Sequence, residues 1–349
     1  MLAGLKAGEY KRGRVDGEGR FAGRRAMVTG AGGFIGRALC AALAAEGAET
    51  VGAEIDERTR AAVEATGASF AACDVRDPAR VAELLAATDV VFHTAAFIHE
   101  GGNMDDFVDL NVRGTINVLD RAAETGVDRV VHLSSVVVYG YEDPATQDED
   151  APLRSYGIPY LDTKSSSDRI ARRRGAVVIR AGDVYGPGSV PWTLRPLRLA
   201  AAGRLAVPAP GDGRMLPVFV DDLVEAALLG ALRGEPGRAY TAWSGEEISF
   251  GDYFDRLVAP TGARCRRVPG AILRMAARAA AALPAGDGPE LGPDALVFVD
   301  RRGSVSNRRI REELGWEPQT TLDSGLQRVA EAASEDLAEA SGASAGAGT

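Results

Sequence analysis

The chain has 349 residues, of which 46% are hydrophobic and 26% charged, and it carries a formal net charge of -9 at pH 7. This composition is typical of a folded globular protein with enough core for one large domain or two small ones. The acidic balance argues against general nucleic-acid binding, which needs clustered Lys and Arg to contact phosphates. We therefore expect a small molecule as the partner.

Residues 1–24 mix Lys, Arg and Gly without an apolar run, so they do not resemble a secretory signal and are interpreted as a flexible extension. The most apolar long stretch, Ala271 to Ala285, contains two arginines and is shorter than the roughly 20 apolar residues that a membrane span needs. The three cysteines lie too far apart to suggest a disulfide framework or a zinc knuckle. We expect a cytoplasmic protein without a membrane span.

Short apolar runs alternate with longer helical patterns through the first half of the chain, which is typical of a doubly wound parallel sheet of the Rossmann type. The predicted strands are Arg25 to Thr29, Thr50 to Glu54, Ser69 to Ala72, Asp89 to His93, Arg129 to Ser134 and Ala176 to Arg180. The predicted helices are Phe34 to Glu46, Val81 to Ala87, Met104 to Thr125 and Tyr156 to Arg174.

Gly and Pro clusters become frequent in the second half of the chain. We therefore predict an α/β protein in which residues 25–182 form a dinucleotide-binding domain. Residues 183–330 are predicted to form mainly a smaller substrate lobe, with some segments returning to the Rossmann domain. Residues 331–349 are predicted to form a flexible tail, because the last of them are only Ser, Gly, Ala and Thr.

The strongest local motif is a glycine loop that follows the first predicted strand and opens the first predicted helix. It reads Gly30-Ala31-Gly32-Gly33-Phe34-Ile35-Gly36, with GxxGxxG spacing. Gly30 suits a tight turn, Gly33 lets the backbone approach a pyrophosphate, and Gly36 allows close packing of helix on strand. The helix N-terminus, with Phe34 and Ile35, would face that anion.

A carboxylate is expected about 20 residues beyond the last glycine, where it accepts hydrogen bonds from ribose hydroxyls. Glu54 lies there, and Asp56 is the alternative ligand. Because a carboxylate repels a 2′-phosphate, the pattern favours NAD over NADP, although Arg58 and Arg60 lie nearby.

Tyr160 and Lys164 are four residues apart on a predicted helix, so both lie on one face. A lysine charge near the phenol favours the phenolate and is expected to lower the pKa of Tyr160, so that it can exchange a proton with an alcohol or carbonyl. The other tyrosines of this region, Tyr139 and Tyr156, have no lysine at that offset. Ser135 ends a buried strand at the sheet edge where ligands bind, and could hold a substrate oxygen beside Tyr160.

Together these motifs resemble the extended short-chain dehydrogenase/reductases, including the NAD-dependent epimerase/dehydratase and 3β-hydroxysteroid-dehydrogenase-like branches. The resemblance covers about Arg24 to Leu326. Its matching stretches are the glycine loop, Asp74-Val75, His93 to Ala96, Asn111 to Thr115, Ser134 to Gly140, Tyr160 to Lys164, Arg180 to Gly188, Val220 to Asp222 and Leu314 to Pro318.

The resemblance implies that Tyr160 is the acid/base, Ser135 the polariser of the substrate oxygen and Lys164 a ribose ligand. Its further cofactor assignments are Asp74 and Val75 against the adenine, Ala95 and Ala96 lining the cleft, and Asn111 supporting the catalytic lysine through its helix. It also suggests a homodimer through helices near residues 104–125 and 156–174. The histidines, His93, His99 and His132, lack metal-ligand companions, so no metal site is predicted.

The chain departs from the nucleotide-sugar members of this family at three places. Asp183 replaces the Asn of their Asn-Val-Tyr-Gly-Pro-Gly run, and an acid there is expected to repel a diphosphate. Met215-Leu216-Pro217 stands where those enzymes have an Arg-Asp-aromatic run. Val136 and Val137 occupy the places of the dehydratases' Asp-Glu pair, which disfavours dehydration.

The sequence thus predicts an NAD-dependent enzyme that transfers hydride between nicotinamide and a secondary alcohol or ketone of a small molecule, not a nucleotide diphosphate sugar. One alternative is an epimerase that keeps NAD bound and passes through a transient ketone. Another is a silent NAD-binding scaffold or redox sensor, against which the combination of Ser135, Tyr160 and Lys164 argues, because a sensor needs only the nucleotide site.

Overall fold

The computed structural model describes residues 19–98, 103–142, 145–281 and 295–345. Its centre is a seven-stranded parallel sheet in the order β12-β7-β5-β4-β1-β2-β3. The strands are β1 (Arg25–Thr29), β2 (Glu49–Glu54), β3 (Ser69–Ala72), β4 (Val90–His93), β5 (Arg129–Ser135), β7 (Val177–Ala181) and β12 (Ala239–Ala242). The six predicted strands are confirmed to within one residue at each end. β12 comes from the second half of the chain and pairs with β7 at the sheet edge.

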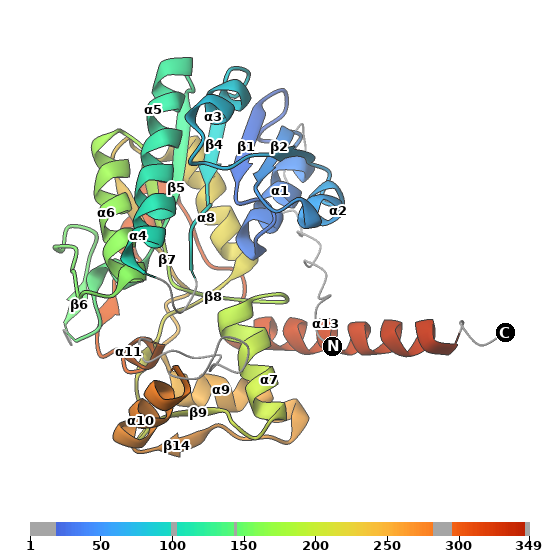
Figure 1. Ribbon diagram of the computed structural model, residues 1–349, viewed down its shortest axis with the longest axis vertical. Coiled ribbons are helices and arrows are strands. Elements are labelled where there is room, and N and C mark those ends of the chain that lie inside the picture. Colours follow the sequence, from blue (N-terminus) through green and yellow to red (C-terminus); the bar gives the residue numbers. More distant parts are fainter. Residues whose placement is uncertain (1–18, 99–102, 143–144, 282–294, 346–349) are drawn as a thin grey trace.

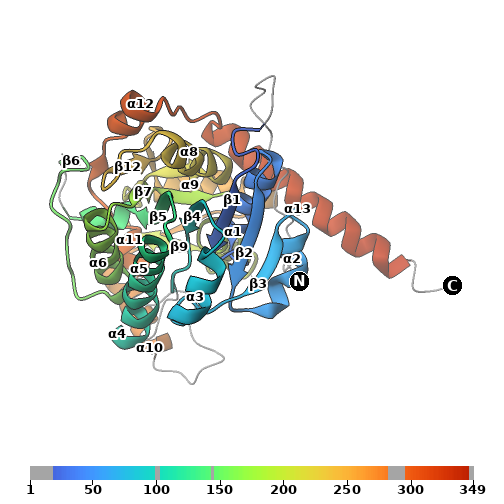
Figure 2. The same cartoon turned by 90° about the horizontal axis from the view of Figure 1, so that it is seen from above.

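Helices cover both faces of this sheet (Figures 1 and 2). One face carries α1 (Phe34–Ala45), α2 (Arg60–Glu64), α8 (Val220–Arg233) and α12 (Arg308–Leu314). The other face carries α3 (Pro78–Leu85), α5 (Thr115–Thr125) and α6 (Pro159–Arg173). The sheet is therefore doubly wound, as the continuous apolar strands indicated.

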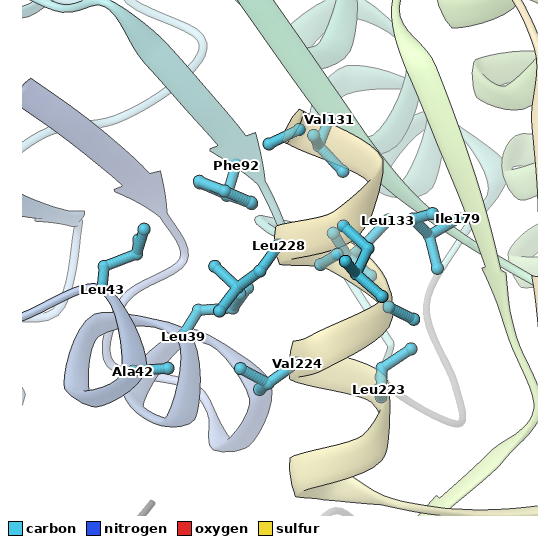
Figure 3. Close-up of a cluster of buried hydrophobic side chains, with 14 of the residues drawn as sticks. Leu39, Ala42, Leu43, Phe92, Val131, Leu133, Ile179, Leu223, Val224 and Leu228 are labelled. Carbon is cyan, nitrogen blue, oxygen red and sulfur yellow. The ribbon is translucent and has the colours of Figure 1, made fainter. Parts of the chain in front are cut away.

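The core on the first face is built where α8 packs against α1 and the sheet (Figure 3). Leu223, Val224 and Leu228 of α8 are at most 1% exposed. They lie with apolar side chains of α1 and of the central strands, namely Leu39, Leu43, Phe92, Val131, Leu133 and Ile179. α8 follows residue 182, so one of the segments that return to the Rossmann domain also supplies much of its core.

The helix predicted over Met104 to Thr125 is helical throughout but is not a single α-helix. It consists of α4 (Met104–Phe107), a π-helical segment η2 (Val108–Gly114) and α5. π-helical turns are frequent at functional sites. Asn111 is in this segment.

Short elements make up the rest of the described chain, most of them in the smaller lobe at the bottom of Figure 1. Four two-stranded sheets pair β8 with β11, β9 with β14, β10 with β13 and β6 with β15. The strands are β6 (Thr146–Gln147), β8 (Asp183–Tyr185), β9 (Ala206–Pro208), β10 (Arg214–Met215), β11 (Pro217–Phe219), β13 (Ile248–Ser249), β14 (Arg266–Val268) and β15 (Ser304–Val305). The helices are η1 (Glu57–Thr59), η3 (Val136–Tyr139), η4 (Val190–Leu194), α7 (Arg195–Ala201), α9 (Phe250–Val258), η5 (Ala259–Thr261), α10 (Gly270–Ala281), α11 (Ala295–Phe298) and α13 (Leu322–Ala345).

Both ends of the described chain differ from the sequence-based expectations. Within the predicted flexible extension, Phe21 is buried against Phe92, and Arg20 forms ion pairs with Glu46 and Glu225. Within the predicted flexible tail, α13 continues to Ala345, because its Ala and Glu residues favour helix. Within the described ranges, every helix is too short or too polar to span a bilayer.

Candidate active site

The glycine loop joins β1 to α1 in a conformation that larger residues could not adopt. Gly30 has φ +70°, and a Cβ atom on it would lie 2.8 Å from the backbone of Ala95. A Cβ atom on Gly36 would lie 2.1 Å from the carbonyl oxygen of Gly30. Gly33 is the N-cap of α1, and because glycine has no side chain it makes no capping hydrogen bond. The backbone of the loop thus packs closely against neighbouring backbone, and no side chain caps the N-terminus of α1.

That N-terminus suits an anion. The first N–H groups of a helix have no acceptor within the helix, and the first turn of α1, which begins with Phe34 and Ile35, contains no acidic residue. Arg37 follows the last glycine and donates from Nη1 to the carbonyl oxygen of Gly32. In the described part of the chain no carboxylate pairs with this half-buried cation, and burial lowers its pKa. The sequence reasoning missed Arg37, although its position directly after the motif could have indicated it.

Glu54 lies against the glycine loop. Its carboxylate accepts hydrogen bonds from the backbone N–H groups of Gly32 at 3.0 Å, Ile55 at 2.8 Å and Asp56 at 3.2 Å. The carboxylate of Asp56, the alternative ligand, is instead bound by Arg58. Of the two carboxylates, the structure therefore brings Glu54 to the loop.

The remaining predicted cofactor residues follow β3 and β4, at the same edge of the sheet. Asp74 pairs with Arg76 at 2.7 Å, and Val75 is 4% exposed. Ala95 and Ala96 are half-buried and follow β4 directly, with the N–H of Ala95 donating to the Thr29 hydroxyl of β1 at 3.3 Å.

Asn111 joins the segment after β4 to helix α6. Its Oδ1 accepts from the N–H of Phe97 at 2.6 Å, and its Nδ2 donates to the carbonyl oxygen of Phe97 at 3.1 Å. Nδ2 also donates to the hydroxyl of Thr163, the neighbour of Lys164, at 3.1 Å. The contact to α6 is thus made through the residue beside the lysine.

Ser135, Tyr160 and Lys164 are brought together by β5 and α6. Ser135 is the last residue of β5, and its side chain lies close enough to that of Tyr160, in the first turn of α6, to act on the pKa of the phenol. Lys164 lies one turn later, is 6% exposed, and donates from Nζ to the carbonyl oxygen of Leu133 on β5 at 2.8 Å. All three therefore lie at the carboxyl edge of the sheet, where ligands bind in folds of this kind.

The electrostatics of this group differ from the expectation that Lys164 lowers the pKa of Tyr160. Burial raises the pKa of the phenol to about 12, and the negative charge of Asp183 acts in the same direction, while the hydrogen bond with Ser135 opposes them. Burial lowers the pKa of Lys164 to about 8, against the effect of Asp168. The ammonium of Lys164 is not among the groups that act on the phenol, and it donates to the Leu133 carbonyl.

Behind α6, a buried polar network holds the helix to the sheet. Asp168 and Arg180 are both 0% exposed and form two parallel hydrogen bonds of 2.9 Å. Ser134, the neighbour of Ser135, donates to Asp168 at 2.7 Å. The remaining guanidinium nitrogen of Arg180 donates to the Tyr139 hydroxyl and to the carbonyl oxygen of Glu149. Every nitrogen of the Arg180 guanidinium thus has a hydrogen-bond acceptor.

In front of Tyr160 the surroundings are aromatic. The ring of Phe298 in α11 lies 6.3 Å from that of Tyr160 and 5.2 Å from that of Tyr141. Val136 and Val137, which follow Ser135, are buried in the same cluster.

A second buried ion pair lies next to this aromatic cluster, and the sequence reasoning missed it. Asp183 and Arg301 form two hydrogen bonds, of 2.7 and 3.1 Å, and the guanidinium lies 5.8 Å from the Tyr141 ring. The carboxylate of Asp183 is therefore not an unpaired charge in this structure, because it is paired with Arg301 and also accepts a hydrogen bond from the N–H of Leu216.

The histidines of the sheet are held by packing. His93 is hydrogen-bonded to Thr29 and Thr115, and burial lowers its pKa to about 3. His132 stacks beside it at 5.3 Å, and His99 lies outside the described residues. Among the described residues, no group of three His, Cys, Asp or Glu side chains is arranged to hold a metal ion.

Comparison with known proteins places this geometry in a family. Residues 26–242, more than half of the chain, match the NAD dependent epimerase/dehydratase family. The chain is 30% identical over 330 residues to UDP-glucose 4-epimerase of Mycolicibacterium smegmatis, covering 88% of this chain and 97% of that protein. It is 27% identical over 325 residues to 2-alkyl-3-oxoalkanoate reductase of Stenotrophomonas maltophilia, covering 87% of this chain and 97% of that protein.

A solved structure agrees with these sequence matches. dTDP-glucose 4,6-dehydratase of Streptomyces venezuelae, solved with NAD bound, superimposes with a TM-score of 0.74 at 26% identity, covering 89% of this chain and 97% of that one. The expectations of a Rossmann fold and of NAD as the cofactor are confirmed. The chain belongs to the NAD dependent epimerase/dehydratase family of extended short-chain dehydrogenase/reductases, and is thus an NAD-dependent oxidoreductase or epimerase.

Proposed function

We propose that this protein interconverts a secondary alcohol and a ketone on a small molecule that carries no nucleotide diphosphate. The observation that carries the proposal is the convergence of Ser135, Tyr160 and Lys164 at the sheet edge beside the glycine loop. Bound NAD would supply the hydride acceptor or donor. The protein's own residues then have to bind the dinucleotide, hold the substrate oxygen and move one proton.

The structure offers a fitting place for each part of the dinucleotide. The pyrophosphate would lie on the open N-terminus of α1, beside Arg37. Glu54, already at the loop, would accept from the adenosine ribose, with Asp74 and Val75 against the adenine. Ala95 and Ala96 would line the cleft, and Lys164 would bind the second ribose.

Tyr160 is proposed as the group that exchanges the proton. With a pKa of about 12, its phenol is protonated at neutral pH and is therefore a donor to a ketone oxygen. Ser135, hydrogen-bonded to it, would hold that oxygen in place. Reduction of a ketone is thus the direction that the resting protonation state supports.

Two features support a substrate other than a nucleotide sugar. The side chains after Ser135 are Val136 and Val137, 2% and 5% exposed, so no carboxylate stands there for dehydration. Arg301, a cation beside the aromatic cluster, is already paired with Asp183. The name of one relative, 2-alkyl-3-oxoalkanoate reductase, denotes a 3-oxo carboxylate, which carries a ketone and no nucleotide, as the substrate of that protein.

Epimerisation is the second candidate, because the relative at 30% identity is a UDP-glucose 4-epimerase. The test is to follow the absorbance of reduced nicotinamide with a series of 3-oxoacyl esters and, separately, the conversion of UDP-glucose to its C4 epimer. Stoichiometric consumption of the reduced cofactor by an ester supports the proposal. Conversion of UDP-glucose without net change in the cofactor would replace it with the epimerase.

We further propose that two copies associate through the exposed sides of α5 and α6, which pack beside each other on one face of the sheet. Sedimentation equilibrium tests this. A monomer at micromolar concentration would contradict it.

A further inference from the structure

The Asp183–Arg301 pair is the feature of the molecule that the proposed chemistry does not use. Asp183 opens β8, at the start of the substrate lobe, and Arg301 comes from the segment after α11, 118 residues away. Asp183 acts electrostatically on Tyr160, and successive ring contacts through Tyr141 and Phe298 connect the guanidinium to the Tyr160 ring. The pair therefore lies beside the aromatic surroundings of the catalytic phenol.

The charges of Asp183 and Arg301 cancel, but not every polar atom at this place has a hydrogen-bond partner. Both carboxylate oxygens of Asp183 accept from Arg301, which is the bidentate geometry of a strong pair. Within the described residues, Nε of Arg301 and the hydroxyl of Tyr141 are buried without a hydrogen-bond partner. A buried donor without a partner is costly and is uncommon in native structures. What is missing at this place is thus a neutral hydrogen-bond partner, not a charge.

We propose that Asp183 determines the charge of the substrate: by neutralising Arg301 internally it restricts the site to uncharged ketones and alcohols. This inference rests on the proposed function. An anionic substrate would lose its hydration and find no net positive charge in return, and the effective cost of burying an ion is several kcal/mol. A neutral carbonyl or ester oxygen loses far less and can still accept from the free donors.

A chain that lacks the Asp183 carboxylate should instead bind anions at this place. In Asp183→Asn, Arg301 would be a buried cation without a counterion, and it would recruit an anion. That anion could be a substrate carboxylate or inorganic phosphate. Asp183 is in this sense a determinant of specificity that acts through Arg301.

The test compares two substrates that differ only in charge, a methyl 3-oxoalkanoate and the corresponding 3-oxo acid. For the wild-type protein we expect kcat/KM to favour the ester by about 100-fold or more, equivalent to about 2.7 kcal/mol. In Asp183→Asn the ratio should shift toward the acid by at least about tenfold. Asp168→Asn is the matched control. It leaves the buried Arg180 behind α6 without its counterion, so it should lower stability without shifting the ratio of kcat/KM for the two substrates.

A second readout does not depend on turnover. The Tm of Asp183→Asn should rise with phosphate concentration at constant ionic strength, because an anion bound only by the folded state stabilises it. The Tm of the wild-type protein and of Asp183→Asn/Arg301→Met should rise less, because these proteins share only the anion site at the N-terminus of α1.

The outcomes separate this inference from the proposed function. Wild-type turnover of the acid as fast as the ester overturns the inference even if the variant does not fold. A folded Asp183→Asn with an unchanged ratio and a phosphate effect no larger than that of the wild-type protein overturns it as well. If the wild-type protein uses neither ketone, the proposed function fails, and the phosphate effect alone decides whether Asp183 masks an anion site.

Discussion

The two buried Arg–Asp pairs described for the candidate active site, Arg180–Asp168 and Arg301–Asp183, differ in how completely they are hydrogen-bonded. Behind α6, Arg180 binds Asp168 and uses its remaining donor on Tyr139 and Glu149. In front, Arg301 binds Asp183 but leaves Nε without a partner in the described residues. A closed network of this kind holds β5, β7 and α6 together, whereas an incomplete one leaves hydrogen-bonding capacity for a ligand. The two pairs do not differ in burial or in charge, so only their hydrogen bonds distinguish them.

Tyr160 lies between these two regions, and its substitution should have the largest effect. Tyr160→Phe removes only the hydroxyl that exchanges the proton, so we expect kcat to fall by about 10²–10⁴-fold, the usual contribution of a general acid or base. NAD affinity, measured by calorimetry, and Tm should change little. Substantial remaining activity would mean that another group moves the proton.

Breaking the pair behind α6 should have the largest effect on stability. Arg180→Met leaves Asp168 as an unpaired buried charge, and removing one partner of a buried pair costs about 3–5 kcal/mol. Urea denaturation measures this. The control is Arg58→Met, which removes the exposed Arg58–Asp56 pair and should leave the transition unchanged. Equal effects of the two substitutions would contradict the structural role of the network.

Substitution of Glu54, at the edge of the sheet where the cofactor is proposed to bind, should have a smaller effect, and that effect is on the choice of cofactor. Glu54→Ala should lower the preference for NAD over NADP by about tenfold or more, since hydrogen bonds to a charged group contribute about 1.5–3 kcal/mol. The ratio of kcat/KM for the two cofactors measures it. Asp56→Ala, at the alternative carboxylate, should leave the ratio unchanged; a shift in Asp56→Ala instead would reassign the ribose ligand.

The stability of the cofactor-free protein should also depend on pH. The pKa of Lys164 is about 8 in the folded chain and near 10.4 when unfolded, so the unfolded state binds more protons between these values. The cost of burying the ammonium is present below pH 8 and disappears as the pH rises to about 10. The free energy of unfolding of the wild type, relative to Lys164→Met, should therefore increase over this range. A constant difference would show that the lysine is not desolvated.

The sequence was most informative where the structure depends on local patterns. The strands from Arg25 to Ala181 are short apolar runs, the turn at Gly30 needs a positive φ, and Tyr160 and Lys164 share a helix face by spacing alone. Each of these features depends on a few neighbouring residues. They could be predicted without knowledge of the tertiary structure.

What could not be predicted depends on contacts between distant segments. The return of β12 to the sheet and the pairing of Asp183 with Arg301 join parts of the chain that no local pattern connects. The pKa of Tyr160 was expected to fall because Lys164 is near in sequence. It rises because burial of the phenol disfavours the phenolate, and the Lys164 ammonium donates to the Leu133 carbonyl.

The central claim is that this chain moves hydride between bound NAD and the carbinol carbon of a neutral small molecule, with Tyr160 completing the reaction. The most direct test supplies reduced cofactor deuterated at the transferable position together with a 3-oxoacyl ester, and analyses the product by mass spectrometry. We predict one deuterium on the new carbinol carbon for each cofactor oxidised, and none with Tyr160→Phe. Oxidation of the cofactor without deuterium in the product would contradict the account.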